Sequence, residues 1–265
     1  MYNLIHAPLQ FYIDRGNKAG VPIIFIHGFP FDHSTWDEQV KIIPSRFRPI
    51  AYDIHGHGQS EAGDGPFSIE FFVDDLFSLI EYLDLEQCVL CGLSMGGYIA
   101  LRAIERKPDL FNGLILCDTR SEPDINETKI NRAASIKLIR EQGIKKYADE
   151  SVKNLFWTEN IRKNIPAIAL IKSIIEKMSS EAISYTLMAL AARTDTTESL
   201  EQIRIPTLII VGEYDKITPP IVAEALHENI TGSDLVVIKD AGHLSNLDNP
   251  EEFNIALLEF LEKVK

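Results

Sequence analysis

The chain has 265 residues, enough for one large domain or for a domain that carries a sizeable insertion. Hydrophobic residues make up 45% and charged residues 25%, a globular composition that excludes a disordered or fibrous chain. The formal net charge is −13 with no basic cluster, which argues against nucleic acid as a partner.

Membrane and export signals are also missing from the sequence pattern. No apolar run approaches the roughly 20 residues that a membrane-spanning helix needs. The opening residues, MYNLIHAPLQF, have neither a basic region nor a long apolar core. We therefore expect a cytoplasmic protein without a membrane partner. The sequence does not indicate its oligomeric state.

The first 120 residues alternate between strand and helix patterns. Continuously apolar runs predict strands buried on both faces, at residues 23–26, 49–52, 89–91 and 114–117. Residues 71–83 and 95–106 between them show helical spacing, and Pro108 follows the second helix. This alternation predicts an α/β fold with a mostly parallel central sheet and helices on both faces.

The strand pattern stops between residues 120 and 200. Helical periods fill the segment at 130–143, which Gly143 ends, at 165–178, and at 179–193, which Ser179 or Ser180 caps. Strands at 207–211 and 235–238 and a helix at 250–264 then resume the alternation. The pattern predicts a core of residues 1–119 and 201–265, interrupted by a helical cap at 120–200.

Cys88 and Cys91 form a C-x-x-C pair next to a turn. In a strand, three residues place the two Cα atoms about 10 Å apart, beyond the roughly 7 Å that a disulfide spans. We interpret both as buried strand residues.

The motif GLSMGG at 92–97 joins a predicted strand to a predicted helix. A serine in such a sharp turn projects its hydroxyl above the sheet, and its neighbours two residues away must be small, as Gly92 and Gly96 are. The start of the helix also points free N–H groups toward charge that develops beside Ser94. Ser94 is therefore a candidate nucleophile.

A serine nucleophile needs a histidine base and an acid that orients it. Asp215 follows the strand at 207–211 in VGEYDKITPP, and His243 follows the strand at 235–238 in DAGHLSNLDNP. Glu213 is the weaker alternative acid, and Asp240 and Asp248 are expected to be loop-capping or surface residues. The sequence thus predicts a catalytic triad of Ser94, Asp215 and His243.

An oxyanion hole requires two N–H donors. One is the residue after the nucleophile, Met95, and the other belongs to the loop IHGFPFDHSTW, in which Phe29 is the expected donor. We interpret His27 as a structural hydrogen-bonding residue and Trp36 as a core residue.

These motifs together resemble the α/β-hydrolase superfamily along the whole chain: HGFP, YDIHGHGQS, GLSMGG, GEYD and DAGH. HGFPFDHSTW, CGLSMGGYIALR and GLILCDTRSEPD resemble bacterial carboxylesterases near the 3-oxoadipate enol-lactonase branch. The resemblance implies the α/β-hydrolase fold with the cap inserted after its sixth strand, and hydrolysis of a small-molecule ester or lactone.

One motif departs from the superfamily pattern, because His55 stands where D-x-R-G-x-G-x-S has arginine. The resulting H-x-H pair, His55 and His57, lacks the further ligands of a metallohydrolase. We expect no metal and no cofactor.

The predicted function is that of a carboxylesterase, a serine hydrolase that cleaves esters of small, largely apolar substrates through an acyl-enzyme. A lactonase (for an enol-lactone or an acyl-lactone), a cofactor-free perhydrolase and a catalytically silent ligand-binding protein remain alternatives, and a C–C bond hydrolase also keeps the serine. Arg120 and Arg193 are the candidate cations for a carboxylate-bearing substrate, but we interpret each first as a solvated surface residue. The expected substrate contacts are Phe156, Trp157, Met188 and Leu244.

Overall fold

A computed structural model describes residues 10–63 and 65–264. The opening residues 1–9, which contribute to the expectation that no export signal is present, lie outside this description, as do residues 64 and 265. No helix of the described residues is long and apolar enough to span a membrane.

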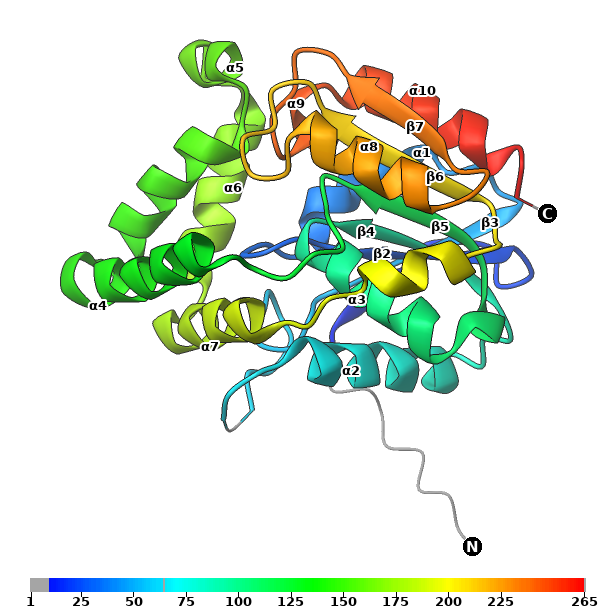
Figure 1. The fold of residues 1–265 in the computed structure, drawn as a ribbon, viewed down its shortest axis with the longest axis horizontal. Helices are drawn as coiled ribbons and strands as arrows, with labels where there is room; N and C mark the ends of the chain where they lie inside the picture. The colour runs from blue at the N-terminus through cyan, green and yellow to red at the C-terminus, as the bar shows by residue number, and fades with distance from the viewer. Residues whose placement is uncertain (1–9, 64, 265) are drawn as a thin grey trace, which may run out of the picture.

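A seven-stranded sheet forms the centre of the described chain, in the order β1-β3-β2-β4-β5-β6-β7 (Figure 1). Only β1 runs antiparallel to its neighbour, β3, and the other pairs are parallel. The strands are β1 (Tyr12–Asp14), β2 (Val21–Ile26), β3 (Phe47–Tyr52), β4 (Cys88–Leu93), β5 (Phe111–Cys117), β6 (Thr207–Gly212) and β7 (Asp234–Ile238).

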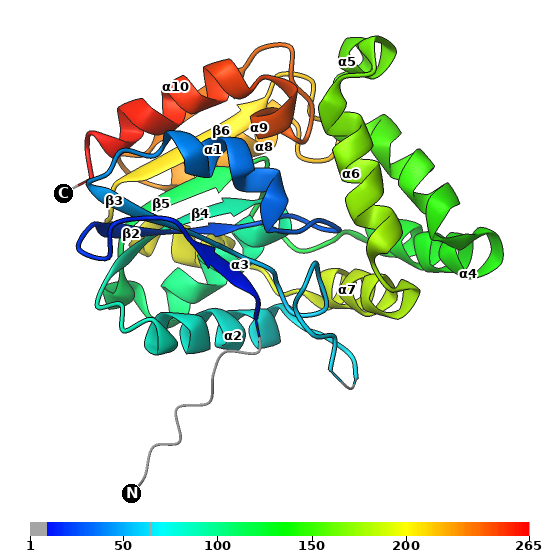
Figure 2. The ribbon, with the colours of Figure 1, turned by 180° about the vertical axis from the view of Figure 1, so that it is seen from behind.

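Helices cover both faces of this sheet, as Figures 1 and 2 show from opposite sides. One face carries α1 (Asp37–Ile42) and α10 (Pro250–Leu261), and the other carries α2 (Ile69–Tyr82), α3 (Met95–Arg106) and α8 (Pro220–Asn229). Residues of β3 and β4 are buried throughout, because helices cover them above and below. The predicted α/β class and mostly parallel sheet are confirmed.

The local signals that start these helices are visible in the sequence. Ser68 precedes α2 and its hydroxyl accepts the N–H of Phe71 at 3.1 Å, which satisfies a free donor of the first turn. Pro220 and Pro250 open α8 and α10, where a missing N–H costs nothing. Cys88 and Cys91 are buried in β4 as free thiols, as expected, and Trp36 is fully buried.

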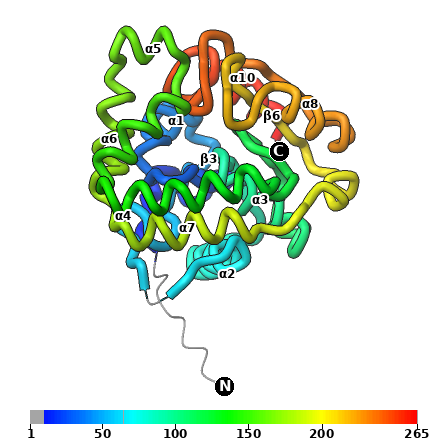
Figure 3. The backbone as a smooth tube through the Cα atoms, turned by 60° about the vertical axis from the view of Figure 1, so that its left-hand side comes forward, coloured from blue at the N-terminus to red at the C-terminus, as the bar shows by residue number. Residues whose placement is uncertain are grey.

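A helical insertion leaves the sheet between β5 and β6. It comprises α4 (Asn126–Leu155), α5 (Thr158–Lys163), α6 (Pro166–Lys177) and α7 (Ser180–Ala192). Figure 3 shows these helices as a separate layer over one end of the sheet. The helical backbone of α4 is interrupted at Gly143, whose φ of 84° bends the chain there. Ser179 caps α7 by accepting the N–H of Ala182 at 3.0 Å.

The strand count differs from the expected one. The resemblance implied six strands ahead of the insertion, and the described residues have five there, β1 to β5. The first of these, β1, is three residues long and only half-buried, so its sequence carries no clear apolar pattern. β5 ends at Cys117 and β6 begins at Thr207, and the segment at 120–200 expected to form the cap lies between them.

Candidate active site

Ser94 lies in a sharp turn between β4 and α3, and its backbone is strained. Its φ of 52° and ψ of −111° fall where few non-glycine residues are found. The turn closes tightly: a Cβ on Gly92 would lie 2.4 Å from the carbonyl oxygen of Gly96, and one on Gly96 would lie 2.2 Å from that of Ile26. Only glycine fits at either position, which explains the spacing of the motif.

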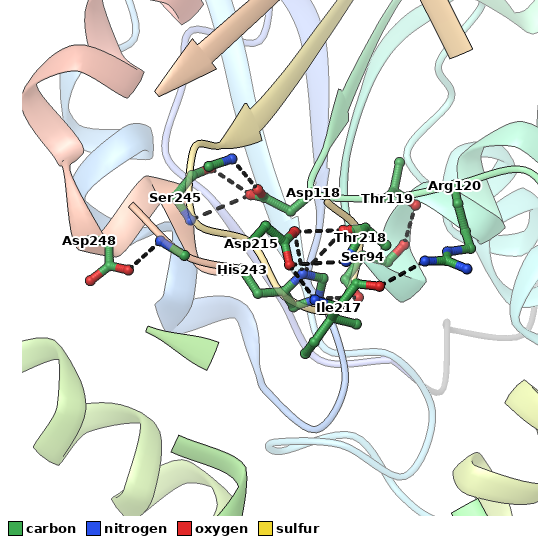
Figure 4. Close-up of polar contacts among 12 residues, drawn as sticks. Ser94, Asp118, Thr119, Arg120, Asp215, Ile217, Thr218, His243, Ser245 and Asp248 are labelled. Carbon is green, nitrogen blue, oxygen red and sulfur yellow. Dashed lines mark hydrogen bonds and ion pairs between the residues drawn. The ribbon is translucent and has the colours of Figure 1, made fainter. Parts of the chain in front are cut away.

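The three side chains predicted to act together form one hydrogen-bonded chain (Figure 4). His243 Nε2 lies 2.8 Å from Ser94 Oγ, and His243 Nδ1 lies 2.8 Å from Asp215 Oδ2. Asp215 accepts a hydrogen bond from the Nδ1–H of His243. In this tautomer of the neutral ring, Nε2 carries no proton and is free to accept the one from Ser94. The strand ends bring these residues together, since β4, β6 and β7 are parallel and their carboxyl ends share one edge of the sheet.

Further hydrogen bonds fix Asp215. Its Oδ1 accepts the N–H groups of Ile217 at 2.7 Å and Thr218 at 3.0 Å, and its Oδ2 accepts the Thr218 hydroxyl at 2.6 Å. Burial raises the pKa of Asp215, but the charge and hydrogen bond of His243 and these donors outweigh it, so the pKa lies below its ordinary value. Thr218 was not among the residues predicted from the sequence.

The pKa of His243 moves the other way. Burial lowers it, but the charge and hydrogen bond of Asp215 outweigh burial and hold it above the ordinary value of 6.5. Asp215 therefore stabilises the imidazolium that forms when the ring takes a proton.

A cavity of about 310 Å³ lies between the helical insertion and this edge of the sheet, and Ser94 and His243 line it. Phe29 and Met95 line it as well. Within the described residues, neither of their backbone N–H groups has a hydrogen-bond acceptor. Ser94 lines the same cavity. These two free N–H groups can donate hydrogen bonds to the negative charge that develops on the oxygen of a bound carbonyl group, and so stabilise it.

The insertion supplies two kinds of lining. Leu187 and Leu190 of α7 present apolar groups. From α4, residues on one helical face before and after Gly143 present mostly polar groups: Thr128, Asn131, Arg132, Ser135, Glu150, Ser151 and Asn154. Leu138, Tyr147 and Leu155 of α4 line the cavity as well, so the lining is largely apolar, with polar side chains along one face of α4.

The four expected substrate contacts lie outside the lining of this cavity. Phe156 and Leu244 are buried at 1% and 0% exposure, because their segments pack together through the Leu244 N–H, which donates to the Leu155 carbonyl at 3.1 Å. The ring of Trp157 stacks on Tyr214 at 5.4 Å, and Met188 is 52% exposed. An apolar residue in a helical pattern is expected to be buried, but the pattern does not identify the element that covers it.

The candidate cations also need correction. Arg120 donates to the Ile217 carbonyl at 2.7 Å, and buried Arg193 binds Asp124 and the Glu122 carbonyl. Arg132 is the cation that lines the cavity. Its Nε and one terminal nitrogen bind Asp124, whereas Nη1 has no acceptor among the described residues. A charged residue in a predicted amphipathic helix gave no signal that would have singled it out.

Asp118, also not identified from the sequence, is fully buried behind the triad. Its carboxyl accepts the Gly212 N–H at 2.8 Å and the Ser245 hydroxyl at 2.5 Å (Figure 4). Burial, with the negative charge of Asp215, raises its pKa above the ordinary range. Two acids thus lie near His243, and only Asp215 contacts its ring.

Three buried histidines outside the triad, His27, His55 and His57, do not line the cavity. His27 Nδ1 donates to the Gly28 carbonyl at 2.7 Å, and its Nε2 accepts the Ile54 N–H at 3.0 Å. His55, which stands where the superfamily pattern has arginine, places its Nδ1 3.4 Å from Asp75 Oδ2 on α2. Burial, reinforced by His27, lowers the pKa of His57 to about 3, so its ring is neutral.

One group of residues outside the cavity lining has metal-like spacing. Ligand atoms of Asp32, His33 and Asp53 lie within 4.8 Å of one another. His33 Nδ1 donates to Asp53 at 2.7 Å, and Asp32 accepts the Ser34 N–H at 2.9 Å. These atoms are therefore engaged in joining the loops after β2 and β3.

A parallel α/β sheet with a serine, histidine and aspartate joined at its carboxyl edge defines a class of hydrolytic enzymes. Residues 23–256 match the family model described as the alpha/beta hydrolase family, so the chain belongs to that family. It is 30% identical to 3-oxoadipate enol-lactonase 2 of Acinetobacter baylyi, over 93% of this chain and 90% of that protein.

Solved structures of similar proteins cover nearly the whole chain. A thermophilic esterase from Thermogutta terrifontis with malate bound superposes with a TM-score of 0.90 at 36% identity, over 96% of this chain and 93% of that one. An enol-lactonase from Burkholderia xenovorans superposes with a TM-score of 0.88 at 27% identity, over 96% of each chain.

Proposed function

We propose that this chain is a serine carboxylesterase that hydrolyses small carboxylic esters through an acyl-enzyme on Ser94. The observation that carries the proposal is the hydrogen-bonded series Ser94, His243 and Asp215 at a cavity that also presents the free N–H groups of Phe29 and Met95. The similarity to an esterase and to enol-lactonases supports the same class of reaction.

The geometry supports a two-step reaction. His243 Nε2, 2.8 Å from Ser94 Oγ, takes the hydroxyl proton as the oxygen attacks the ester carbonyl. The Phe29 and Met95 N–H groups bind the oxyanion, and His243 then protonates the leaving alcohol. In the second step His243 takes a proton from water, which attacks the acyl group and releases the carboxylic acid from Ser94.

In this proposal residues 120–200 act as a cap over the site. Leu187 and Leu190 contact the apolar part of the substrate, and the polar face of α4 contacts a carbonyl, hydroxyl or charged group. The cavity measures about 310 Å³, a volume in the range of pockets that hold small organic ligands, which supports a small ester as the substrate.

The test is the release of p-nitrophenol from p-nitrophenyl acetate by the wild-type chain and by Ser94→Ala. We expect turnover by the wild type and a loss of about 10⁵-fold or more in the variant, because the nucleophile acts as a unit with its base. A wild type without turnover on acetate and butyrate esters would sink the proposal, as would an unchanged Ser94→Ala variant.

A second candidate is hydrolysis of a lactone or ester that carries a carboxylate. Arg132 favours it, because this cation lines the cavity while buried Asp124 holds the guanidinium in place. Relatives named enol-lactonases support the lactone form.

A matched substrate pair tests the second candidate: p-nitrophenyl pentanoate and mono-p-nitrophenyl glutarate, which differ chiefly in a terminal carboxylate. Arg132→Gln is expected to lower kcat/KM for the glutarate by about tenfold or more, the value of a charged hydrogen bond, and to leave the pentanoate nearly unchanged. Arg140→Gln, on the exposed side of α4, is the control. Equal effects on both substrates would contradict a carboxylate site at Arg132.

A further inference from the structure

We propose that Asp118 is a positioning residue for the triad: it joins the loops that carry Asp215 and His243 to the strand end that supports Ser94. This inference rests on the proposed serine mechanism and adds to it a residue that touches neither substrate nor the reacting atoms. Asp118 is fully buried and does not line the cavity.

Three consecutive residues at the end of β5 contact all three triad segments. The Cys117 carbonyl accepts the Ser94 N–H at 2.8 Å, and the Thr119 hydroxyl donates to the Ser94 carbonyl at 2.7 Å. Both neighbours of Asp118 therefore hold the strained turn of the nucleophile. The side chain between them is directed at the other two loops (Figure 4).

The Asp118 carboxyl divides its two oxygens between those loops. Oδ1 accepts the N–H of Gly212, three residues before Asp215, at 2.8 Å. Oδ2 accepts the hydroxyl of Ser245, two residues after His243, at 2.5 Å, and its N–H at 3.4 Å. One buried group thus sets the separation of the acid loop and the histidine loop.

The backbone supports a specific requirement for this residue type. Asp118 has a φ of 46°, in the left-handed region, and its own N–H donates to the Ile210 carbonyl at 2.8 Å. Aspartate and asparagine tolerate this conformation better than other non-glycine residues. The chain therefore leaves β5 within one residue, while the carboxyl stays among the loops it connects.

A second buried aspartate, Asp53, allows the proposed role of Asp118 to be distinguished from a contribution to stability alone. Asp53 is the first residue after β3, as Asp118 is after β5, and it is equally buried. It accepts the N–H groups of His33 at 2.7 Å and Gln59 at 2.8 Å, which belong to loops without triad residues. Loss of the Asp118 or the Asp53 carboxyl group would weaken hydrogen bonds to two segments of the chain. Only the segments that Asp118 contacts lead to the triad residues Asp215 and His243.

The experiment measures kcat and KM for p-nitrophenyl acetate, the rate at which a fluorophosphonate labels Ser94, and the unfolding midpoint. Asp118→Ala is expected to lower kcat and the labelling rate by about 100-fold with KM within about twofold, because misplacing reacting groups by about 1 Å costs this much. Asp118→Asn keeps one accepting oxygen and should recover about tenfold of that loss. Asp53→Ala should lower the unfolding midpoint and reduce kcat by about tenfold or less, because the His33 loop that it holds also carries the Phe29 donor.

Ser245→Ala tests the same idea if Asp118→Ala does not fold. It removes one hydroxyl contact and should lower kcat by about fivefold to tenfold with KM nearly unchanged, and it should lower the unfolding midpoint by only a few degrees, since one buried hydrogen bond is lost. A folded Asp118→Ala with wild-type kcat, a Ser245→Ala variant without loss, or an equal loss of kcat in Asp53→Ala would overturn the role of Asp118. A wild type that neither turns over nor is labelled overturns the proposed function instead.

Discussion

The carboxyl edge of the sheet and the helical insertion meet at one cavity. The sequence predicted which side chains lie together at the edge of the sheet, but not which side chains of the insertion line the cavity. At the edge, Ser94, Asp215 and His243 were predicted to act together, and their side chains are hydrogen-bonded. In the insertion, the expected contacts Phe156, Trp157 and Met188 lie outside the cavity lining. A strand end fixes where the next side chain lies, whereas a helical period indicates a buried face without identifying what covers it.

The largest expected effect on kcat comes from a substitution at the carboxyl edge of the sheet. Asp215→Asn should lower kcat by about 10⁴-fold, because the His243 ring loses the acceptor that fixes its tautomer. The unfolding midpoint should change little, since the asparagine amide has nearly the same size as the Asp215 carboxyl group that it replaces. Steady-state kinetics with thermal unfolding checks this, and a variant with more than a tenth of wild-type kcat would contradict the role of Asp215.

Two glycines compare how tightly the regions are packed. Gly96→Ala should destabilise the fold by about 3 kcal/mol or more, because its Cβ would lie 2.2 Å from the Ile26 carbonyl oxygen. Gly143→Ala meets no atom within 4 Å, so only its φ of 84° is unfavourable, at about 1 to 2 kcal/mol. Urea unfolding of both variants gives the order, and a milder effect at Gly96 would show that the turn is adaptable.

The pH dependence sharpens the electrostatic side of the comparison. The pKa of His243 is raised, so the ring holds its proton to a higher pH than an ordinary histidine does. Below this pKa the ring is protonated and cannot act as a base. We expect kcat/KM to fall about tenfold per unit as pH decreases through a value above 6.5. A profile of p-nitrophenyl acetate hydrolysis that is flat from pH 5 to 8 would remove His243 as the base.

The smallest effects distinguish neighbours on α7. Leu187 lines the cavity, whereas Met188 is 52% exposed. Leu187→Ala should raise KM for p-nitrophenyl butyrate severalfold, at about 0.8 kcal/mol for each lost CH₂ contact. Met188→Ala should leave KM unchanged and the unfolding free energy within about 0.5 kcal/mol. A larger change in KM at Met188 would restore the contact expected from the sequence.

Much of the fold followed from the apolar pattern, because β4 is buried along its whole length and α3 ends just before Pro108. The short half-buried β1 carried no such pattern. Arg132 and Asp118 could not be found from the sequence, since each depends on partners far along the chain: the cavity for one, and Gly212 and Ser245 for the other.

The most direct measurement is the intact mass of the chain after incubation with a fluorophosphonate, for the wild type, Ser94→Ala and the control Ser135→Ala. Ser135 also lines the cavity, but its hydroxyl donates to the Asn131 carbonyl at 3.0 Å, and no histidine of the described residues bonds to it. We predict one adduct on the wild type and on Ser135→Ala, and none on Ser94→Ala. An unlabelled wild type, or an adduct that persists in Ser94→Ala, would contradict the assignment of Ser94 as the activated nucleophile.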